Sequence, residues 1–298
     1  MSTNLPPQIR ERTVSKARTL LEALPFMREH HGKVIVVKYG GAAMEKAGLA
    51  KPFAEDIALL RSAGINPVVV HGGGPQVTQM SAQLGIETQF VDGLRVTDAQ
   101  TLDVATMVLA GKLNTDVVST LVTGDVPAVG LSGVDGGLLL ARKQSGPDLG
   151  FVGEVVHVNP GVVHTLLEQR YVPVIASIAM DGTGQAYNVN ADVVASELAM
   201  ALGAEKLVFI NDVPGLIGAA GDLLSELSAQ QCLDLLAADG VVEGGMIPKL
   251  ESAVRALKAG VGRVHLVDGR VEHSLVLELF TPEGVGTMIT PDADGSES

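Results

Sequence analysis

The sequence has a single cysteine, Cys232, among its 298 residues. This excludes a disulfide within the chain and is typical of a protein kept in a reducing compartment. Cys232 lies in an apolar helical pattern, which favours core packing over a role as a nucleophile. Positive charge is also scarce, because 21 Lys and Arg against 34 Asp and Glu give a net charge of −13. Non-specific nucleic-acid binding requires clustered Lys and Arg, so no nucleic-acid partner is expected.

Long uninterrupted apolar runs are absent as well. The first thirty residues carry charged side chains at short intervals, so we expect no signal peptide. Residues 62–86 contain no Asp, Glu, Lys or Arg, but Gly, Gln, Asn, Pro and His interrupt them, so we expect no membrane span. These features predict a cytoplasmic protein. The acidic composition does not exclude a nucleotide ligand, because the field within a site can oppose the net charge.

Short apolar runs recur between helix-like segments, at residues 34–37, 67–70, 126–131, 172–178, 207–210 and 263–267. Continuous rather than alternating apolar character is typical of strands buried on both faces, as in a parallel sheet. Gly64, Gly85, Gly203 and Gly260 each follow a helical pattern, where a left-handed residue commonly ends the helix. The pattern predicts an α/β fold, a three-layer α-β-α sandwich around a mainly parallel central sheet.

Other segments give more local predictions. Residues 8–31 form an amphipathic pattern that predicts a helix, which Pro25 should kink or restart. The apolar face of this helix could pack on its own core or on another subunit. Residues 132–160 predict hairpins that cover the sheet, and the acidic tail 291–298 predicts disorder. Thr97-x-x-Gln100 and Ser228-x-x-Gln231 match capping boxes, in which the first side chain starts a helix.

Three glycine-rich motifs suggest a ligand site. They are Lys38-Tyr39-Gly40-Gly41, His71-Gly72-Gly73-Gly74 and Gly244-Gly245-Met246-Ile247-Pro248-Lys249. Glycine turns expose backbone N–H groups to anions, and lysines add mobile positive charge. Because ligands bind beyond the carboxyl ends of parallel strands, we expect the motifs that follow strands to meet at one edge of the sheet. Together they predict a phosphoryl-transfer site without a Walker A loop, although a lone lysine or tight turn would carry no such meaning.

Two further motifs carry polar side chains. Asp192, in Asn188-Val189-Asn190-Ala191-Asp192, could simply cap a helix, or it could hold two lysines in position and keep them charged. Asn188 and Asn190 offer neutral donors and acceptors to a polar substrate. Arg95 could be a surface charge or could clamp a carboxylate through two hydrogen bonds. His71 is interpreted as a structural hydrogen-bonding residue rather than a catalyst.

Five motifs in order, at residues 37–41, 70–75, 93–97, 188–192 and 244–249, resemble the amino-acid kinase family and, within it, the acetylglutamate kinases. The resemblance runs from about Lys33 to Ile289. It implies ATP-dependent phosphorylation of the side-chain carboxylate of N-acetyl-L-glutamate, giving N-acetyl-L-glutamyl 5-phosphate in the second step of arginine biosynthesis. It also implies Mg²⁺ carried by the ATP phosphates rather than by a metal site of the protein, as this small ion prefers phosphate oxygens and water.

The resemblance also implies roles for individual residues. The catalytic residues would be Lys38, Lys249 and Asp192. Substrate would be bound by Gly41, Gly73, Gly74, Arg95 and Asn188. The nucleotide would be bound by Asp212, Val213, Pro214, Gly215, Leu216 and Ile217. Residues 32–203 would form the N-acetylglutamate-binding lobe and residues 204–298 the ATP-binding lobe.

A further resemblance concerns regulation. Arginine-inhibited members of the family resemble this chain in two features: an N-terminal helical extension, here residues 1–31, and a Glu-x-x-x-x-x-Gly-x-Gly-Thr run, here residues 278–287. The resemblance implies inhibition by L-arginine and a hexamer, a trimer of dimers, with interlaced N-terminal helices. The implied arginine contacts are Lys206, His273, Glu278 and Gly286. Some relatives also bind a PII-type signalling protein, and the sequence leaves that partner open.

Two alternatives remain at this point. Another kinase of the same fold could act on acetylaminoadipate, carbamate, aspartate or a nucleoside monophosphate. A pocket discriminates one extra methylene by only about 1–3 kcal/mol, so acetylaminoadipate is the nearest competitor. A non-catalytic arginine sensor is the alternative from another class, and the presence of both lysines and Asp192 argues against it.

Overall fold

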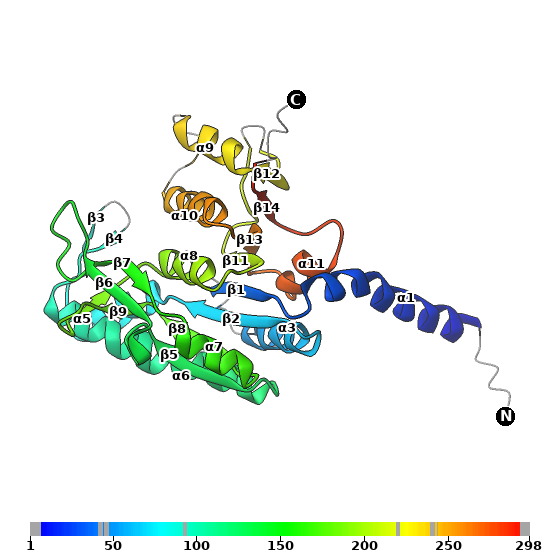
Figure 1. Cartoon of the computed structure of the whole chain (residues 1–298), viewed down its shortest axis with the longest axis horizontal. Coiled ribbons are helices and arrows are strands. Elements are labelled where there is room, and N and C mark those ends of the chain that lie inside the picture. Colours follow the sequence, from blue (N-terminus) through cyan, green and yellow to red (C-terminus); the bar gives the residue numbers. More distant parts are fainter. Residues whose placement is uncertain are drawn as a thin grey trace.

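The computed structural model describes residues 7–40, 44, 48–91, 94–218, 221–238, 242 and 244–292. Its centre is an eight-stranded sheet with the order β12-β14-β13-β11-β1-β2-β8-β5 and with helices on both faces (Figure 1). Only the pairing of β13 with β14 is antiparallel among these strands. The bounds are β1 Val34–Tyr39, β2 Asn66–His71, β5 Ala128–Ser132, β8 Val172–Ala176, β11 Lys206–Asn211, β12 Glu226–Ser228, β13 Arg263–Asp268 and β14 Thr287–Thr290.

The six apolar runs correspond to the six strands β1, β2, β5, β8, β11 and β13, so the predicted sheet is confirmed. The short strands β12 and β14 lack such runs, and the sequence did not predict them. The parallel register pairs Lys38 with Val70 of β2 and with Phe209 of β11. The carboxyl ends of β1, β2 and β11 therefore lie at one edge, where the glycine and lysine motifs meet.

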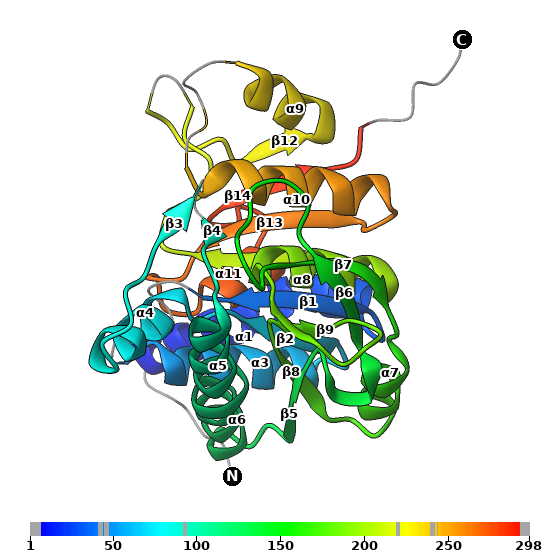
Figure 2. The same ribbon diagram turned by 90° about the vertical axis from the view of Figure 1, so that its left-hand side faces the viewer.

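Successive residues of β1 face opposite layers of the sandwich, as the pleat of a strand requires. Ile35 and Val37 join the core beneath α3 (Ala50–Ser62), α6 (Asn114–Thr123) and α11 (Ser274–Phe280). Val36 joins the core on the other face. The helices of that face are α7 Gly161–Glu168, α8 Ala191–Ala201, α9 Ala229–Ala237 and α10 Met246–Lys258. Figure 2 shows these layers from a second direction.

A second sheet adjoins the carboxyl edge of the first. Its order is β10-β9-β6-β7, and β6 pairs antiparallel with β7, which confirms the hairpin predicted in residues 132–160. A two-stranded ribbon of β3 and β4 lies nearby (Figure 2). The bounds are β3 Phe90–Val91, β4 Leu94–Arg95, β6 Leu139–Lys143, β7 Gly153–Val158, β9 Ile178–Met180 and β10 Ala186–Asn188.

Further helical segments lie along the chain between β2 and β6. They are α4 Gly74–Gln83, α5 Ala99–Thr106, the π-helical η1 Met107–Leu113 and the short 3₁₀ turn η2 Asp135–Gly137. The segments α5, η1 and α6 follow one another without a break. A π-helical segment inside a longer helix is uncommon and is frequently found at functional sites.

Most predicted helix ends are confirmed. The four predicted capping glycines, residues 64, 85, 203 and 260, have φ values of 81°, 73°, 57° and 100°. Ser228 forms its capping box with Gln231. The box predicted at Thr97 is wrong by one residue, because the carboxylate of Asp98 accepts the hydrogen bond from the backbone N–H of Thr101 at the start of α5.

The N-terminal helix α1 spans Pro7–His30, close to the predicted range. It continues through Pro25, so of the predicted kink or restart at this residue the restart does not occur. Phe26 and Met27 pack against the core near α3 and α11, while the earlier part of the helix projects away from the body (Figure 1). No helix in the described residues has the length and apolar character needed to cross a bilayer. Most of the predicted disordered tail lies outside the described residues.

The packing of α3 leads to a stability prediction. Leu60 is fully buried, whereas Leu84, at the end of α4, is 55% exposed. Leu60→Ala should lower the free energy of unfolding by about 2–5 kcal/mol, because it leaves a cavity in the core. Leu84→Ala should change it by no more than about 0.5 kcal/mol. Urea unfolding of both variants measures the difference, and equal effects would contradict the described core.

Candidate active site

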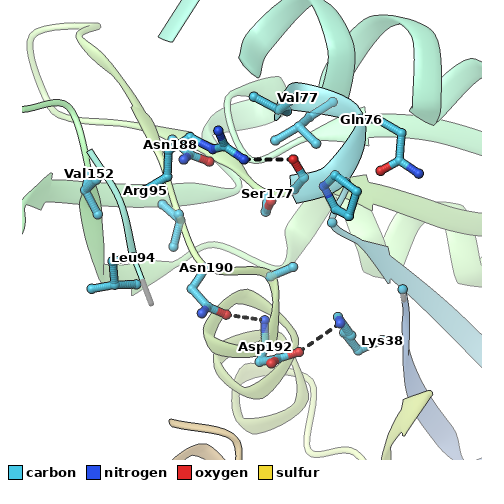
Figure 3. A pocket seen from close by; sticks show the side chains of 18 of the residues that line it. Lys38, Gln76, Val77, Leu94, Arg95, Val152, Ser177, Asn188, Asn190 and Asp192 are labelled. Atoms are coloured by element: carbon cyan, nitrogen blue, oxygen red, sulfur yellow. Dashed lines mark hydrogen bonds and ion pairs between the residues drawn. The ribbon is translucent and has the colours of Figure 1, made fainter. Parts of the chain in front are cut away.

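A cavity of about 290 Å³ opens at the carboxyl edge of the central sheet, between β1, β2, α4, α8 and the β4 ribbon strand. It brings together six of the predicted site residues from distant parts of the chain: Lys38, Gly73, Gly74, Arg95, Asn188 and Asp192 (Figure 3). Residues without a sequence signal also line it, among them Gln76, Phe90 and Ser177. Gly41, predicted to contact substrate, lies outside the described residues.

The strongest electrostatic feature is a carboxylate between two ammonium groups. The Nζ atom of Lys38 lies 3.1 Å from Oδ1 of Asp192, and Nζ of Lys249 lies 2.7 Å from Oδ2. Asp192 is only 7% exposed. Burial alone would raise the pKa of Asp192, but the two lysines more than offset this effect and bring it to about 2. Asp192 is therefore an anion at neutral pH and holds both cations.

The position of Asp192 follows from the start of α8. Its backbone N–H donates to Oδ1 of Asn190 at 2.8 Å, so Asn190 is the residue that caps the helix. The alternative in which Asp192 acts only as the cap is therefore wrong. Since Asn190 satisfies the helix end, the carboxylate of Asp192 is free to pair with Lys38 of β1 and Lys249 of α10.

Within the glycine turn 72–74, Gly73 has a backbone conformation that residues with a side chain rarely adopt. Gly73 has φ of 157°, and a Cβ atom there would lie 2.2 Å from Leu113 and 2.8 Å from Leu109. All three carbonyl groups of the turn are engaged by the protein. Nδ1 of His71 lies 3.0 Å from the carbonyl oxygen of Gly72. The backbone N–H of Val77 donates to the carbonyl of Gly73, and Nη2 of Arg95 donates to the carbonyl of Gly74. The polar groups that these glycines can offer a ligand are therefore their N–H groups, at the N-terminus of α4, which suits an anion.

Arg95 is buried rather than a surface charge, with 8% exposure. Its Nη2 donates to the oxygen of Gly74 and to Oγ1 of Thr78, both at 2.7 Å, and its guanidinium lies 4.8 Å from the ring centre of Phe90. Its Nη1 is buried and makes no hydrogen bond within the described residues. A buried donor without a partner is costly, so this group fits a ligand that brings an acceptor. Asn188 lines the same cavity.

The predicted nucleotide segment, residues 212–217, follows β11 at the same edge of the sheet, although it does not line the cavity. Leu216 is buried, and its N–H donates to Oγ1 of Thr287 at 2.8 Å. Gly215 has φ of 148°, and a Cβ atom there would lie 2.5 Å from the same Oγ1. Val213 and Ile217 are 36% and 42% exposed, so they present apolar surface next to the strand end.

The residues predicted to contact arginine do not all meet. Lys206 starts β11 at the opposite edge of the sheet, is 4% exposed, and interacts electrostatically with Glu278. Burial lowers the pKa of Lys206 to about 8, with Arg263 adding to this effect. Glu278 accepts hydrogen bonds from the N–H groups of Val285 at 2.8 Å and Gly286 at 3.0 Å, and Nδ1 of His265 lies 2.6 Å from it.

His273 differs from this group. Its Nδ1 lies 2.6 Å from the buried carboxylate of Asp56 on α3, so its side chain is held by another helix. No short-range pattern indicated this pairing, because the two residues are 217 positions apart. The structure therefore associates Lys206, Glu278 and Gly286 with one another and gives His273 a separate partner.

Comparison with known proteins agrees with the architecture. Residues 33–268 match the amino acid kinase family. The chain is 51% identical over 290 residues to an acetylglutamate kinase from Symbiobacterium thermophilum, covering 94% of this chain and 99% of the relative. It is 47% identical over 294 residues to an acetylglutamate kinase from Carboxydothermus hydrogenoformans, covering 94% of this chain and all of the relative.

Solved structures share the fold. An N-acetylglutamate synthase from Neisseria gonorrhoeae, complexed with coenzyme A and N-acetyl-glutamate, superposes with a TM-score of 0.84 at 28% identity. The match covers 93% of this chain but only 64% of the synthase. The same synthase complexed with coenzyme A and L-arginine gives a TM-score of 0.79 at 27% identity, over 92% of this chain and 65% of the synthase. The family match and the extent of the kinase relatives together place this chain in the amino acid kinase family, among the acetylglutamate kinases.

Proposed function

We propose that this enzyme transfers the γ-phosphoryl group of ATP to the side-chain carboxylate of N-acetyl-L-glutamate, giving N-acetyl-L-glutamyl 5-phosphate for arginine biosynthesis. The observation that carries the proposal is the pairing of Asp192 with Lys38 and Lys249 beside a glycine turn that offers N–H groups. The high identity to acetylglutamate kinases over nearly the whole chain supports the same reaction.

The chemistry requires cations and amides rather than a base. A carboxylate acceptor is already deprotonated at neutral pH, so its oxygen can attack the γ-phosphorus in line without losing a proton. Lys38 and Lys249 stabilise the charge on the migrating phosphoryl group, and Asp192 positions both lysines. The protein contributes orientation and electrostatic stabilisation, which agrees with the pairing of the Asp192 carboxylate with two lysines.

The substrate lies in the cavity of 290 Å³. The unpartnered Nη1 of Arg95 binds its α-carboxylate, Asn188 contacts the same part of the molecule, and the N–H groups of Gly73 and Gly74 bind the reacting end. Gly41 is assigned to substrate by resemblance only. The complex of the related synthase with N-acetyl-glutamate supports the choice of substrate class.

The nucleotide occupies the side of the site bordered by residues 212–217. In this division, residues 32–203 form the acceptor lobe and residues 204–298 the ATP lobe. The described residues contain no group of three His, Cys, Asp or Glu side chains suited to a metal ion. Lys38, Lys249 and the backbone N–H groups of the site suit phosphate oxygens, and Mg²⁺ would be held by the ATP phosphates and water, where it would neutralise part of their charge.

Substrate choice is the direct test of the proposal. We expect ADP release with N-acetyl-L-glutamate to exceed that with N-acetyl-L-2-aminoadipate, because the extra methylene must fit the same small cavity. A pocket of this kind discriminates by about 1–3 kcal/mol, or roughly 10–200-fold in kcat/KM. A preference for the longer substrate would instead assign an acetylaminoadipate kinase, and no turnover of either would refute the proposal.

The role of Lys249 leads to a second prediction. Lys249→Ala should lower kcat by about 10²–10³, the effect of losing one preorganised donor to the transition state. Lys258→Ala, at the exposed end of the same helix, is the matched control and should leave kcat unchanged. Steady-state kinetics at saturating substrates measures both. A near-normal kcat in Lys249→Ala would remove this residue from the mechanism.

We also propose feedback inhibition by L-arginine and a hexamer joined through the N-terminal helices. Lys206, Glu278 and Gly286 form a buried polar group near the end of α1, and Glu278 offers a carboxylate to a guanidinium. His273 is a weaker candidate, because it already pairs with Asp56. Val14, Leu20 and Leu21 of α1 are 52%, 70% and 66% exposed, which favours packing on another subunit. The synthase complex with L-arginine supports the ligand class.

The N-terminal helix can be tested separately from catalysis. Deletion of residues 1–28 should remove inhibition by arginine while preserving activity in its absence. Because Phe26 and Met27 pack on the core, the double substitution L20D/L21D is the milder control. It should disrupt the hexamer, measured by light scattering, and weaken inhibition without exposing the core. Inhibition that persists at full strength in both proteins would exclude a role for the helix.

A further inference from the structure

The glycine turn is connected to the protein interior by a buried histidine that the reaction does not use. His71 is the last residue of β2 and has no exposed surface. Its Nδ1 lies 3.0 Å from the carbonyl oxygen of Gly72, and its Nε2 lies 3.1 Å from Nδ2 of Asn114. Both ring nitrogens are therefore satisfied, as buried polar atoms must be to avoid a desolvation cost.

The other partners of Asn114 determine where the proton of His71 resides. Nδ2 of Asn114 also lies 3.0 Å from the carbonyl oxygen of Val174 and 3.3 Å from that of Leu131. Carbonyl oxygens can only accept, so the amide nitrogen of Asn114 must face this group. Its two hydrogens are shared among three acceptors, of which Nε2 of His71 is one. The carbonyl of Gly72 can likewise only accept, so the proton of the ring is on Nδ1, and Nδ1–H donates to Gly72. Burial lowers the pKa of His71, which agrees with a neutral ring.

This hydrogen bond determines the orientation of one peptide group. The bond between Gly72 and Gly73 is trans and planar, so the carbonyl of Gly72 and the N–H of Gly73 point in opposite directions. Holding the carbonyl toward His71 turns the N–H of Gly73 to the other side of the peptide plane. Glycine has little preference of its own between such orientations, so the bond from His71 supplies the preference.

The neighbouring strand β5 leaves space for the side chain of Asn114. A Cβ atom at Gly130 of β5 would lie 1.9 Å from Oδ1 of Asn114, so glycine leaves the space that the amide occupies. Asn114 begins α6 directly after the π-helical η1. Leu109 and Leu113 of η1 fill the space beside Gly73. The continuous segment of η1 and α6 therefore contacts the turn in two ways. Leu109 and Leu113 lie beside Gly73, and Asn114 contacts His71, which bonds to Gly72.

We propose that Asn114 and His71 are positioning residues for the anion-binding turn. Asn114 selects the Nδ1–H tautomer of His71, and His71 holds the Gly72–Gly73 peptide so that the N–H of Gly73 serves the acceptor carboxylate. Neither side chain touches the reacting atoms. The kinetic consequence rests on the proposed function, whereas the tautomer does not depend on it.

Two substitutions at His71 separate positioning from packing. The amide nitrogen of His71→Asn occupies the δ position and can donate to Gly72, whereas that of His71→Gln occupies the ε position and cannot. We expect His71→Gln to raise the KM for N-acetyl-L-glutamate on the order of 10-fold more than His71→Asn, the scale of one buried hydrogen bond. The KM for ATP should stay near the wild-type value in both. Equal losses in the two variants, in proportion to their thermal stability, would overturn the proposal.

Asn114→Ala tests whether Asn114 selects the tautomer of His71, and Val117→Ala is its control on the same helix. Both residues are 6% exposed, but Val117 contributes only apolar packing. In ¹⁵N-histidine NMR spectra, the wild type should show the Nδ1–H tautomer at His71. Asn114→Ala should populate the Nε2–H tautomer and raise the KM for the acceptor, whereas Val117→Ala should lower Tm without either change.

The outcomes also separate this inference from the proposed function. An Nε2–H tautomer in the wild type would overturn the positioning roles of Asn114 and His71, whatever the substrate is. A wild-type enzyme that shows the Nδ1–H tautomer but does not phosphorylate N-acetyl-L-glutamate would refute the proposed function instead. An unchanged KM for the acceptor in Asn114→Ala, together with the altered tautomer, would overturn the claim that His71 orients the Gly72–Gly73 peptide for substrate binding.

Discussion

The site depends on one buried carboxylate between two ammonium groups. Without Asp192, the ammonium groups of Lys38 and Lys249 would repel each other, since each lies within 3.1 Å of the same carboxylate. With it, the two ammonium groups share one carboxylate, and they hold the pKa of Asp192 at about 2 despite burial. Two positive charges and one negative charge leave a local excess of positive charge in a protein whose net charge is −13. That local field, rather than the overall charge, suits a polyphosphate.

This arrangement requires the central sheet. Lys38 comes from β1, Asp192 from the first turn of α8 and Lys249 from the first turns of α10, so the carboxylate joins three separate elements. The backbone complements these charges. Because every carbonyl of the turn 72–74 is engaged by the protein, the turn offers N–H groups to an anion. Cations and amides together suit phosphoryl transfer to a carboxylate, which needs no proton acceptor.

The central strand β11 runs between the buried polar group at Lys206 and the segment 212–217. Lys206, in the buried polar group with Glu278, starts it, and residues 212–217 follow its last residue. The proposed arginine site and the proposed nucleotide segment therefore adjoin the two ends of one strand, at opposite edges of the sheet. The end of α1 lies beside the proposed arginine site, since Glu29 pairs with Arg263 at 3.3 Å and His30 is fully buried. A helix that bridges subunits would thus adjoin the same region.

The sequence by itself determined the six apolar strands of the central sheet, most helix ends and the motif residues that line the cavity. Buried parallel strands are apolar on both faces, capping glycines follow their helices, and glycine turns stand beside their lysines, so each of these signals is local. Only the tertiary structure decided the pairings between distant residues, such as His273 with Asp56 and His71 with Asn114. It also decided that Asn190 rather than Asp192 caps α8. These contacts depend on the order of the strands in the sheet, which packing of the whole chain sets and no short segment encodes.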